Sequence, residues 1–202
     1  MKGRSFDVLI VGIGGQGTIL SSNILGEACI AEGKTVRGAE SHGMAQRGGS
    51  VESHVRIGGL FGPLIVPGTA DLLVSFDLLE ALRYRHYLLK GGKLVVNSRF
   101  VVPTSVYLQG LPVPEGTGIL SQLKPCNPCV IDAEKIAFEA GSPLVQNVVI
   151  LGAASHFLPL SEHSLTSAVE RLVPPKTVEL NRKAFELGRK AGAQCKGGDT
   201  SD

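Results

Sequence analysis

The chain has 202 residues, of which 43% are hydrophobic and 19% are charged, as in an ordinary globular protein of one domain. Its 20 basic and 18 acidic side chains leave a net charge of only +2, which argues against a nucleic-acid partner bound through bulk charge. The sparse aromatic residues and the absence of Trp argue against a surface that stacks on bases. No segment reaches the ~20 apolar residues of a membrane span, so we expect no membrane partner either.

The first residues superficially resemble a signal peptide, because Lys2 and Arg4 precede an apolar stretch. Asp7 interrupts that stretch, and a glycine cluster follows where a cleavage site of small residues would stand. We therefore interpret this segment as the first strand of a cytoplasmic protein.

The apolar run over residues 8–11, in a predicted strand over 7–11, turns directly into the sequence Gly-Ile-Gly-Gly-Gln-Gly. A helical recurrence of apolar residues follows over 18–32, and Gly33 stands where a C-cap glycine belongs. A glycine-rich turn between a strand and a helix N-terminus is suited to bind an anion, commonly a phosphate or pyrophosphate. The candidate binding residues of this segment are Gly12, Gly14, Gly15, Gln16 and Gly17.

A second glycine-rich segment follows a predicted strand over 35–39 and reads Glu-Ser-His-Gly-Met-Ala-Gln-Arg-Gly-Gly-Ser over 40–50. An arginine beside two glycines can bind a phosphate or carboxylate through two hydrogen bonds. The alternative is a solvated loop in which this arginine pairs with a nearby glutamate. The candidate binding residues of the second segment are His42, Arg47, Gly48 and Gly49.

The alternation of elements predicts one α/β domain over 1–192, with a polar, disordered tail over 193–202. We expect a doubly wound, Rossmann-like, mostly parallel sheet with helices on both faces and one half-exposed strand, antiparallel or at an edge, over 51–57. Both glycine-rich segments follow strands and should meet at one edge of this sheet. The other predicted elements are strands at 71–76, 93–97 and 130–132, helices at 78–89, 133–140, 147–157, 161–172 and 175–190, and irregular chain over 101–124.

The four cysteines are too few and too scattered to predict a disulfide framework. Cys126 and Cys129 form a C-x-x-C pair, which supplies only half of a typical zinc or iron–sulfur ligand set. Cys29 falls in a helix and Cys195 in the tail, so neither is an obvious partner. Incidental thiols, a redox pair and a metal shared between chains all stay open, and no metal site is assigned to this chain.

One hypothesis is an enzyme that binds NAD(P) or a flavin dinucleotide. Glu40 stands 23 residues after Gly17, near the offset of a ribose-binding acid. The long polar loop after the second strand weakens this hypothesis, since a crossover helix would be expected there. Asp132 and His156 are the available acid–base residues, and we interpret them as a helix cap and a core residue.

The two glycine-rich segments, followed by Ser-His-Val-Arg-Ile at 53–57, resemble the gamma subunit or domain of 2-oxoacid:ferredoxin oxidoreductases, in particular the small beta subunit of the indolepyruvate enzymes. The resemblance covers residues 6–190, is loose over 100–128, and does not include the Cys126–Cys129 pair. Further matching segments are Ala70–Leu73, Glu80–Tyr84, Asn147–Gly152, Val178–Asn181 and Ala184–Phe185.

The resemblance implies a small subunit that completes an active site for oxidative decarboxylation of a 2-oxoacid to acyl-coenzyme A. Thiamine diphosphate and iron–sulfur clusters would belong to a large partner subunit, through which electrons pass to ferredoxin. This chain has neither a four-cysteine cluster motif nor the G-D-G start of a thiamine diphosphate motif, and we assign it no catalytic residue. The glycine-rich edge would contact coenzyme A or the partner subunit, and a homodimer within a larger assembly is compatible with this. A binding-only regulatory domain is a further alternative, and the identity of the 2-oxoacid is left open.

Overall fold

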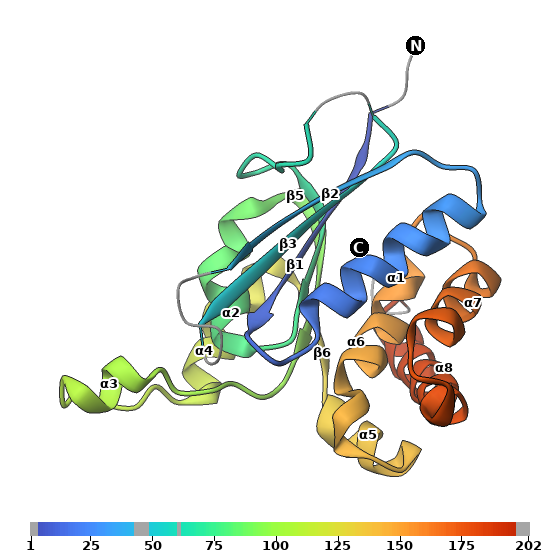
Figure 1. The fold of residues 1–202 in the computed structure, drawn as a ribbon. Helices are drawn as coiled ribbons and strands as arrows, with labels where there is room; N and C mark the ends of the chain where they lie inside the picture. Colours follow the sequence, from blue (N-terminus) through green and yellow to red (C-terminus); the bar gives the residue numbers. More distant parts are fainter. Residues whose placement is uncertain (1–3, 43–48, 60–61, 197–202) are drawn as a thin grey trace.

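A six-stranded sheet runs through the described part of the chain, residues 4–42, 49–59 and 62–196 of this computed structural model, with helices on either side (Figure 1). The strand order is β2-β3-β1-β4-β5-β6. Apolar residues alternate between the two faces of β1, so that Val8 and Ile10 enter one core cluster and Leu9 and Val11 the other. The strands are β1 (Phe6–Ile13), β2 (Val36–His42), β3 (Ser50–Ile57), β4 (Ala70–Ser75), β5 (Leu88–Asn97) and β6 (Cys129–Ile131).

Helices cover both faces of this sheet, which confirms the predicted doubly wound architecture. One layer contains α1, α5, α6, α7 and α8, and the other contains α2 and α4 (Figure 1). The helices are α1 (Thr18–Ala31), α2 (Leu78–Tyr84), α3 (Thr104–Leu108), α4 (Gly116–Leu123), α5 (Ala133–Ala140), α6 (Gln146–Ala154), α7 (Glu162–Leu172) and α8 (Val178–Lys196). None of the helices in the described ranges combines the length and apolar character needed to cross a bilayer.

The pairing of β3 is antiparallel to both of its neighbours, as its alternating sequence predicted. It does not lie at the sheet edge, which β2 occupies instead. It is also less exposed than expected, because even His54 on its polar side is only 3% exposed. The Nδ1 atom of His54 accepts a hydrogen bond from Ile65 N at 3.1 Å, and its Nε2 atom lies 3.8 Å from Oε1 of Glu52.

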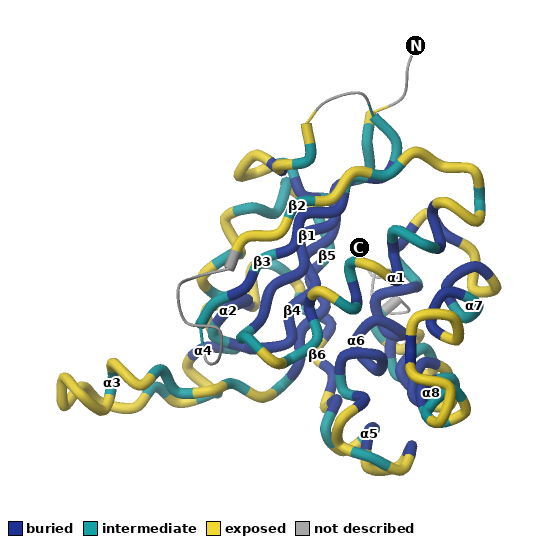
Figure 2. Tube along the Cα trace, viewed as in Figure 1, coloured by how far each residue is buried: buried dark blue, intermediate teal, exposed yellow. Residues whose placement is uncertain are grey.

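Glycine residues bring the backbones of α6 and α8 into direct contact. A Cβ atom at Gly192 would stand 2.6 Å from the Cα of Ala153, and one at Gly188 would collide with the backbone of Val149. Every α6 residue from Asn147 to Ala154 is buried as a result (Figure 2). The predicted buried helix over 147–157 is therefore confirmed, with a 3₁₀ turn in place of its last residues.

Local helix signals predicted from the sequence are confirmed at three boundaries. Asp132 caps α5 by accepting a hydrogen bond from Lys135 N at 3.1 Å, and Ser161 caps α7 by accepting one from Ser164 N at 3.1 Å. Gly33 follows α1 with a positive φ of 67°.

The predicted helix over 78–89 is wrong in its second half. Helix α2 ends at Tyr84, a 3₁₀ turn covers Arg85–Tyr87, and β5 begins at Leu88. The glycines at 91 and 92 do not end a helix but accompany a register irregularity between β4 and β5. A Cβ at Gly92 would lie 2.9 Å from the carbonyl oxygen of Ala70, so this glycine permits a close backbone approach.

Two segments expected to be irregular contain regular structure. Residues 101–124 include α3 and α4, and only α4 places apolar side chains in the core, those of Ile119 and Leu123. Both ends of the predicted polar loop belong to strands, since β2 continues through residues 40–42 and Ser50 begins β3. Residues 43–48 lie outside the described residues.

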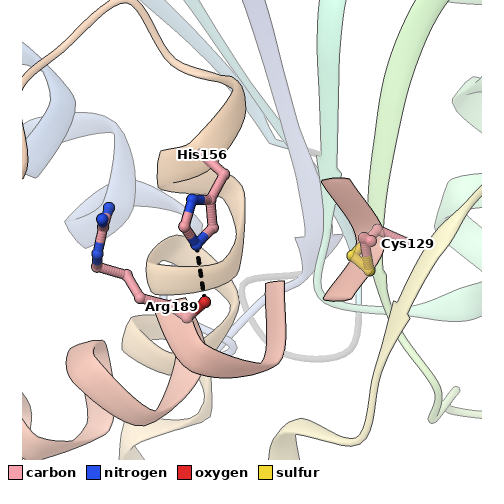
Figure 3. The surroundings of a disulfide bond; sticks show 4 residues. Cys129, His156 and Arg189 are labelled. Atoms are coloured by element: carbon pink, nitrogen blue, oxygen red, sulfur yellow. Dashed lines mark hydrogen bonds between the residues drawn. A yellow bond between two sulfur atoms is a disulfide. The ribbon is translucent and has the colours of Figure 1, made fainter. Parts of the chain in front are cut away.

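The last helix extends beyond its predicted end at residue 190 and reaches Lys196. Residues 193–196, expected to be tail, are therefore helical, and 197–202 lie outside the described residues. The end of α8 passes the start of β6, where Cys195 forms a disulfide with Cys129 across a Cα–Cα distance of 5.4 Å (Figure 3). The expectation that Cys195 is not a partner of the Cys126–Cys129 pair is wrong, because the fold brings the end of α8 against β6, 66 residues earlier in the sequence.

Candidate functional site

The two glycine-rich segments meet at one edge of the sheet. The amide of Gly14 donates a hydrogen bond to the carbonyl oxygen of Gly49 at 2.8 Å. Because β3 is antiparallel to β1, Ser50 at its start pairs with Ile13 at the end of β1. The predicted convergence is therefore confirmed, although it arises through β3 and not through a crossover helix.

The first glycine-rich segment is held in one conformation by Gln16. Its Oε1 atom accepts a hydrogen bond from Ile13 N at 2.8 Å, and its backbone N–H donates to Ile13 O at 3.0 Å. A Cβ atom at Gly12 would stand 2.8 Å from that Oε1 and 3.1 Å from Cγ2 of Thr18. Glycine at position 12 therefore makes room for the side chain that fixes the turn.

Gly17 brings the start of α1 against the start of α6. It has a positive φ of 85°, and a Cβ there would lie 2.5 Å from Nδ2 of Asn147. The first four backbone N–H groups of an α-helix have no carbonyl partner within the helix. They lie at the positive end of the helix dipole. The N-terminus of α1 therefore adds positive potential beside this turn.

A cleft of about 330 Å³ opens beside the turn. It lies beyond the carboxyl ends of β1 and β4, adjacent strands whose following helices cover opposite faces of the sheet. Ligands of open α/β sheets bind at such switch points. The lining residues are Gly15, Gln16, Phe76, Asp77, Asn97, Arg99, Phe100, Val101, Pro143, Leu144, Gln146 and Asn147.

Of the predicted site residues in the described part of the chain, Gly15 and Gln16 line this cleft directly. The lining residues from the ends of β4 and β5 and from the start of α6 were not predicted as site residues. The sequence contained a signal for them, because Asp77 lies two residues after β4 and Asn97 ends β5. Ligand-binding residues of α/β sheets gather at such strand ends.

Asp77 is fully buried and serves as a fixed hydrogen-bond acceptor. Its Oδ1 accepts from Leu79 N at 2.8 Å and Glu80 N at 3.2 Å, which caps α2, and its Oδ2 accepts from Val101 N at 2.7 Å. Burial raises the pKa of this carboxyl above its usual value, although the three amides and Arg83 oppose the shift. Asp77 thus ties the start of α2 to the chain that follows β5.

The polar residues of the cleft floor are also part of the scaffold. Asn97 donates from Nδ2 to Phe76 O and accepts at Oδ1 from Ala133 N, both at 3.3 Å. Arg99 forms an ion pair with Glu134. The lining residues described offer the side-chain amides of Gln16 and Asn147, the guanidinium of Arg99 and the carboxylate of Asp77, so the cleft is equipped to bind and orient a polar group.

The second glycine-rich segment is supported by a buried glutamate. Ser50 donates from Oγ to Oε2 of Glu80 at 2.5 Å, and Arg83 pairs with the Oε1 of Glu80 at 3.0 Å. Burial raises the pKa of Glu80, while Ser50 and Arg83 act in the opposite direction. Because Gly49 directly precedes Ser50, Glu80 helps to position the carbonyl that holds Gly14.

The remaining candidate residues lie elsewhere on the sheet or outside the described residues. His42 is the last residue of β2, its side chain is outside the described residues, and so are Arg47 and Gly48. Glu40 accepts a hydrogen bond from Ser22 Oγ at 3.0 Å on the edge strand, which β3 separates from β1. It is therefore not positioned as the ribose-binding acid of a dinucleotide fold, where the second strand would adjoin the first.

Asp132 and His156 have structural partners, as interpreted from the sequence. Asp132 caps α5, and the Nε2 atom of His156 lies 2.8 Å from Arg189 O, to which it donates (Figure 3). Within the described ranges, no three His, Cys, Asp or Glu side chains come together in a group that could hold a metal ion. The free cysteines of these ranges are the buried Cys29 and the half-buried Cys126.

Comparisons with known proteins agree with this fold and with the resemblance of the glycine-rich segments. The chain is 40% identical to the indolepyruvate oxidoreductase subunit IorB of Thermococcus kodakarensis, across 96% of the chain and 99% of the relative. It is also 40% identical to IorB of Archaeoglobus fulgidus, across 90% and 92%.

The crystal structure of the gamma subunit of the keto/oxoacid ferredoxin oxidoreductase from Geobacter sulfurreducens superimposes with a TM-score of 0.70 at 29% identity. This superposition covers 94% of the chain and 99% of that subunit. The family model described as "Pyruvate ferredoxin/flavodoxin oxidoreductase" matches residues 7–191. The chain therefore belongs to the pyruvate ferredoxin/flavodoxin oxidoreductase family.

Proposed function

We propose that this chain completes the active site of a ferredoxin-dependent oxidoreductase that decarboxylates indolepyruvate or a related aryl pyruvate to the acyl-coenzyme A. It is the small, non-autonomous subunit of a 2-oxoacid oxidoreductase, since relatives spanning its whole length are subunits of such enzymes. The observation that carries the indolepyruvate assignment is the 40% identity across 99% of a curated indolepyruvate oxidoreductase subunit. The dinucleotide-binding alternative is not favoured.

The cofactors of the reaction fit a partner subunit better than this chain. Iron–sulfur clusters are held by groups of cysteine thiolates, and two of the four cysteines here are joined in a disulfide. Thiamine diphosphate, when bound in the large subunit, supplies the stabilised carbanion of the decarboxylation. The chain's own contribution is to cover that site, exclude water from it and orient the incoming thiol substrate.

Coenzyme A is the ligand we propose for the cleft beside the first glycine-rich segment, in contact with the loops that contain Gly12, Gly14–Gly17, His42 and Arg47–Gly49. The side-chain amides of Gln16 and Asn147, the guanidinium of Arg99 and the N-terminus of α1 are the kinds of donor that bind a pyrophosphate. The cleft of about 330 Å³ lies at the small end of the range for ligand pockets. It would hold one part of coenzyme A, and the large subunit would enclose the rest.

The test is co-expression with the thiamine-dependent large subunit of the same organism. We expect the two chains to co-purify and to reduce ferredoxin, through the clusters of the large subunit, with indolepyruvate and coenzyme A. Pyruvate and 2-oxoglutarate serve as comparison substrates. Failure to co-purify, together with full activity of the large subunit alone, would contradict the proposal. A rise in the melting temperature of the isolated chain with NAD(H), NADP(H) or FAD would instead favour the dinucleotide alternative.

The coenzyme A contact has a separate test in the Gln16→Ala variant of the complex. Loss of this side chain frees the turn, so we expect the KM for coenzyme A to rise several-fold while the KM for the 2-oxoacid is unchanged. Asn23→Ala, on the helix that follows this turn but outside the cleft, is the matched control. An unchanged KM for coenzyme A in Gln16→Ala would indicate that this edge binds only the partner subunit.

A further inference from the structure

A segment with no charged side chain projects from the body of the molecule. Residues 100–114, here called the arm, include 15 consecutive residues without Asp, Glu, Lys, Arg or His, between Arg99 and Glu115. They run outward from the end of β5, form the short helix α3 and return to α4 (Figure 1). The arm is exposed along most of its length (Figure 2).

The arm presents large apolar side chains to solvent. Leu108 is 82% exposed and Tyr107 is 63% exposed, and α3 contains no buried residue. Exposed apolar patches rimmed by polar residues mark protein–protein contacts on soluble proteins. The exposed large apolar residues of the arm are Val101, Tyr107, Leu108, Leu111 and Val113.

The tip of the arm around α3 places no residue of this helix in the core. The hydrogen bonds around α3 stay within the arm, as from Val106 N to Pro103 O at 3.0 Å and from Leu111 N to Val106 O at 2.9 Å. A five-residue helix is far shorter than the ~12–15 residues that an isolated helix needs to be even marginally stable in water. A surface that packs against α3 would therefore stabilise it.

The base of the arm belongs to the cleft. Phe100 and Val101 line the cleft together with Gly15 and Gln16, and Val101 N is held by Oδ2 of Asp77 at 2.7 Å. A partner that covers the arm down to its base would therefore stand at the mouth of the cleft. The arm and the cleft form one continuous surface.

Charged side chains in three other cavities of the described surface argue against a second copy that would receive the arm in one of them. Three further cavities on the described surface are lined in part by charged side chains, which an uncharged arm would have to desolvate. These charged residues are Glu27 and Glu40 in one cavity, Lys93 in another, and Arg85, Lys90 and Lys93 in the third.

We infer that the arm docks in an uncharged, apolar groove of the large thiamine-dependent subunit, next to the active site that the two chains share. The inference rests on the proposed function, which places that subunit at the cleft. It assigns the contact to α3 and the residues that flank it. Docking would order the arm and close the cleft in one event.

The test measures the dissociation constant between this chain and the large subunit. We expect Leu108→Lys to weaken binding at least tenfold, because docking would bury a charge, and Tyr107→Ser to weaken it by a similar factor. A lysine at the C-terminal end of α3 suits the helix dipole, so the melting temperature of the isolated chain should not change. Leu64→Lys, 63% exposed and outside the arm, is the matched control and should change binding less than twofold.

Hydrogen exchange gives a second readout that needs no variant, since residues 104–108 should become protected only in the complex. Wild-type-like binding by both arm variants, with no protection of 104–108, would overturn the inference and leave the proposed function intact. Absence of binding by the wild-type chain would overturn both. Self-association of the isolated chain that Leu108→Lys abolishes would identify a second copy as the occupant and would also overturn the inference.

Discussion

Gly17 is the residue at which the first glycine-rich segment packs against the start of α6. Its positive φ and its contact with Asn147 both require the absence of a Cβ. We expect Gly17→Ala to lower the free energy of unfolding by about 1–3 kcal/mol, measured by urea denaturation. Gly15 also has a positive φ, but a Cβ there would have no neighbour within 4 Å. Gly15→Ala should therefore lower the free energy of unfolding by less, because it adds only backbone strain. Equal costs for the two variants would contradict the contact with α6.

Glu32 produces a specific acid sensitivity. Lys34, the largest cause, Ser164 and the amide of Ser161 bind its carboxylate and lower its pKa from 4.5 to about 2. Since the folded-state pKa lies below the unfolded one, this stabilisation is present above pH 4.5 and is lost as the pH falls toward 2. We expect wild-type protein to lose more stability than Glu32→Gln across this window, measured by denaturant titration at each pH.

Lys34→Met serves as the graded control, because it removes the largest cause of the shift and keeps the carboxylate. The stability that this variant loses at acid pH should fall between the losses of the wild type and of Glu32→Gln. Parallel pH profiles for all three proteins would show that these contacts do not stabilise the junction of α1 with α7.

At this scale the sequence predicts residues whose partners are close in the chain. Asp132 and Ser161 cap the helices that follow them, and the glycines of the first turn serve the strand and helix on either side. Asp77 and Glu80 were not predicted as site residues, because their partners Val101 and Ser50 lie 24 and 30 residues away. Such pairs exist only once the sheet has brought distant loops together.

At the scale of elements, the close contact between α6 and α8 predicts that two Gly→Ala substitutions have opposite effects on the free energy of unfolding. Gly188→Ala would force a Cβ into the backbone of Val149, and we expect a loss of about 3 kcal/mol in the free energy of unfolding. Gly26→Ala lies inside α1 with open space around it and should instead stabilise by about 0.5–1 kcal/mol. Urea denaturation of both variants measures the difference, and a neutral Gly188→Ala would contradict the close packing.

The disulfide between β6 and α8 closes a loop of 66 residues, for which chain entropy alone predicts about 4 kcal/mol of stabilisation. We expect Cys195→Ser to lower the free energy of unfolding by 2–4 kcal/mol under non-reducing conditions. Cys126→Ser is the matched control and should stay within about 0.5 kcal/mol of the wild type. Identical stability of Cys195→Ser and wild type would mean that the bond does not form in solution.

The elements predicted wrongly are those decided by tertiary contacts. Apolar residues after Tyr84 continue a helical pattern, yet pairing with β4 makes Leu88 onward a strand. The extension of α8 to Lys196 depends in the same way on β6, which lies far earlier in the sequence. The doubly wound class was predictable because it rests on the alternation of elements and not on their exact ends.

For the molecule as a whole, the decisive feature is the antiparallel strand β3 between β2 and β1. It carries the second glycine-rich segment to the end of β1, beside a cleft and an exposed arm. The cleft has a polar floor, few reactive groups and an open rim, as expected of a surface that another subunit completes. Sequence reasoning located this edge, whereas the cleft and the arm depend on loops that follow β4 and β5.

The most direct test titrates this chain into the purified large subunit and follows ferredoxin reduction with indolepyruvate and coenzyme A. Activity should be very low without this chain and should rise to a plateau once every large subunit has bound one. A large subunit that is fully active alone, and whose rate does not respond to added small chain, would contradict the proposal that this chain completes the active site.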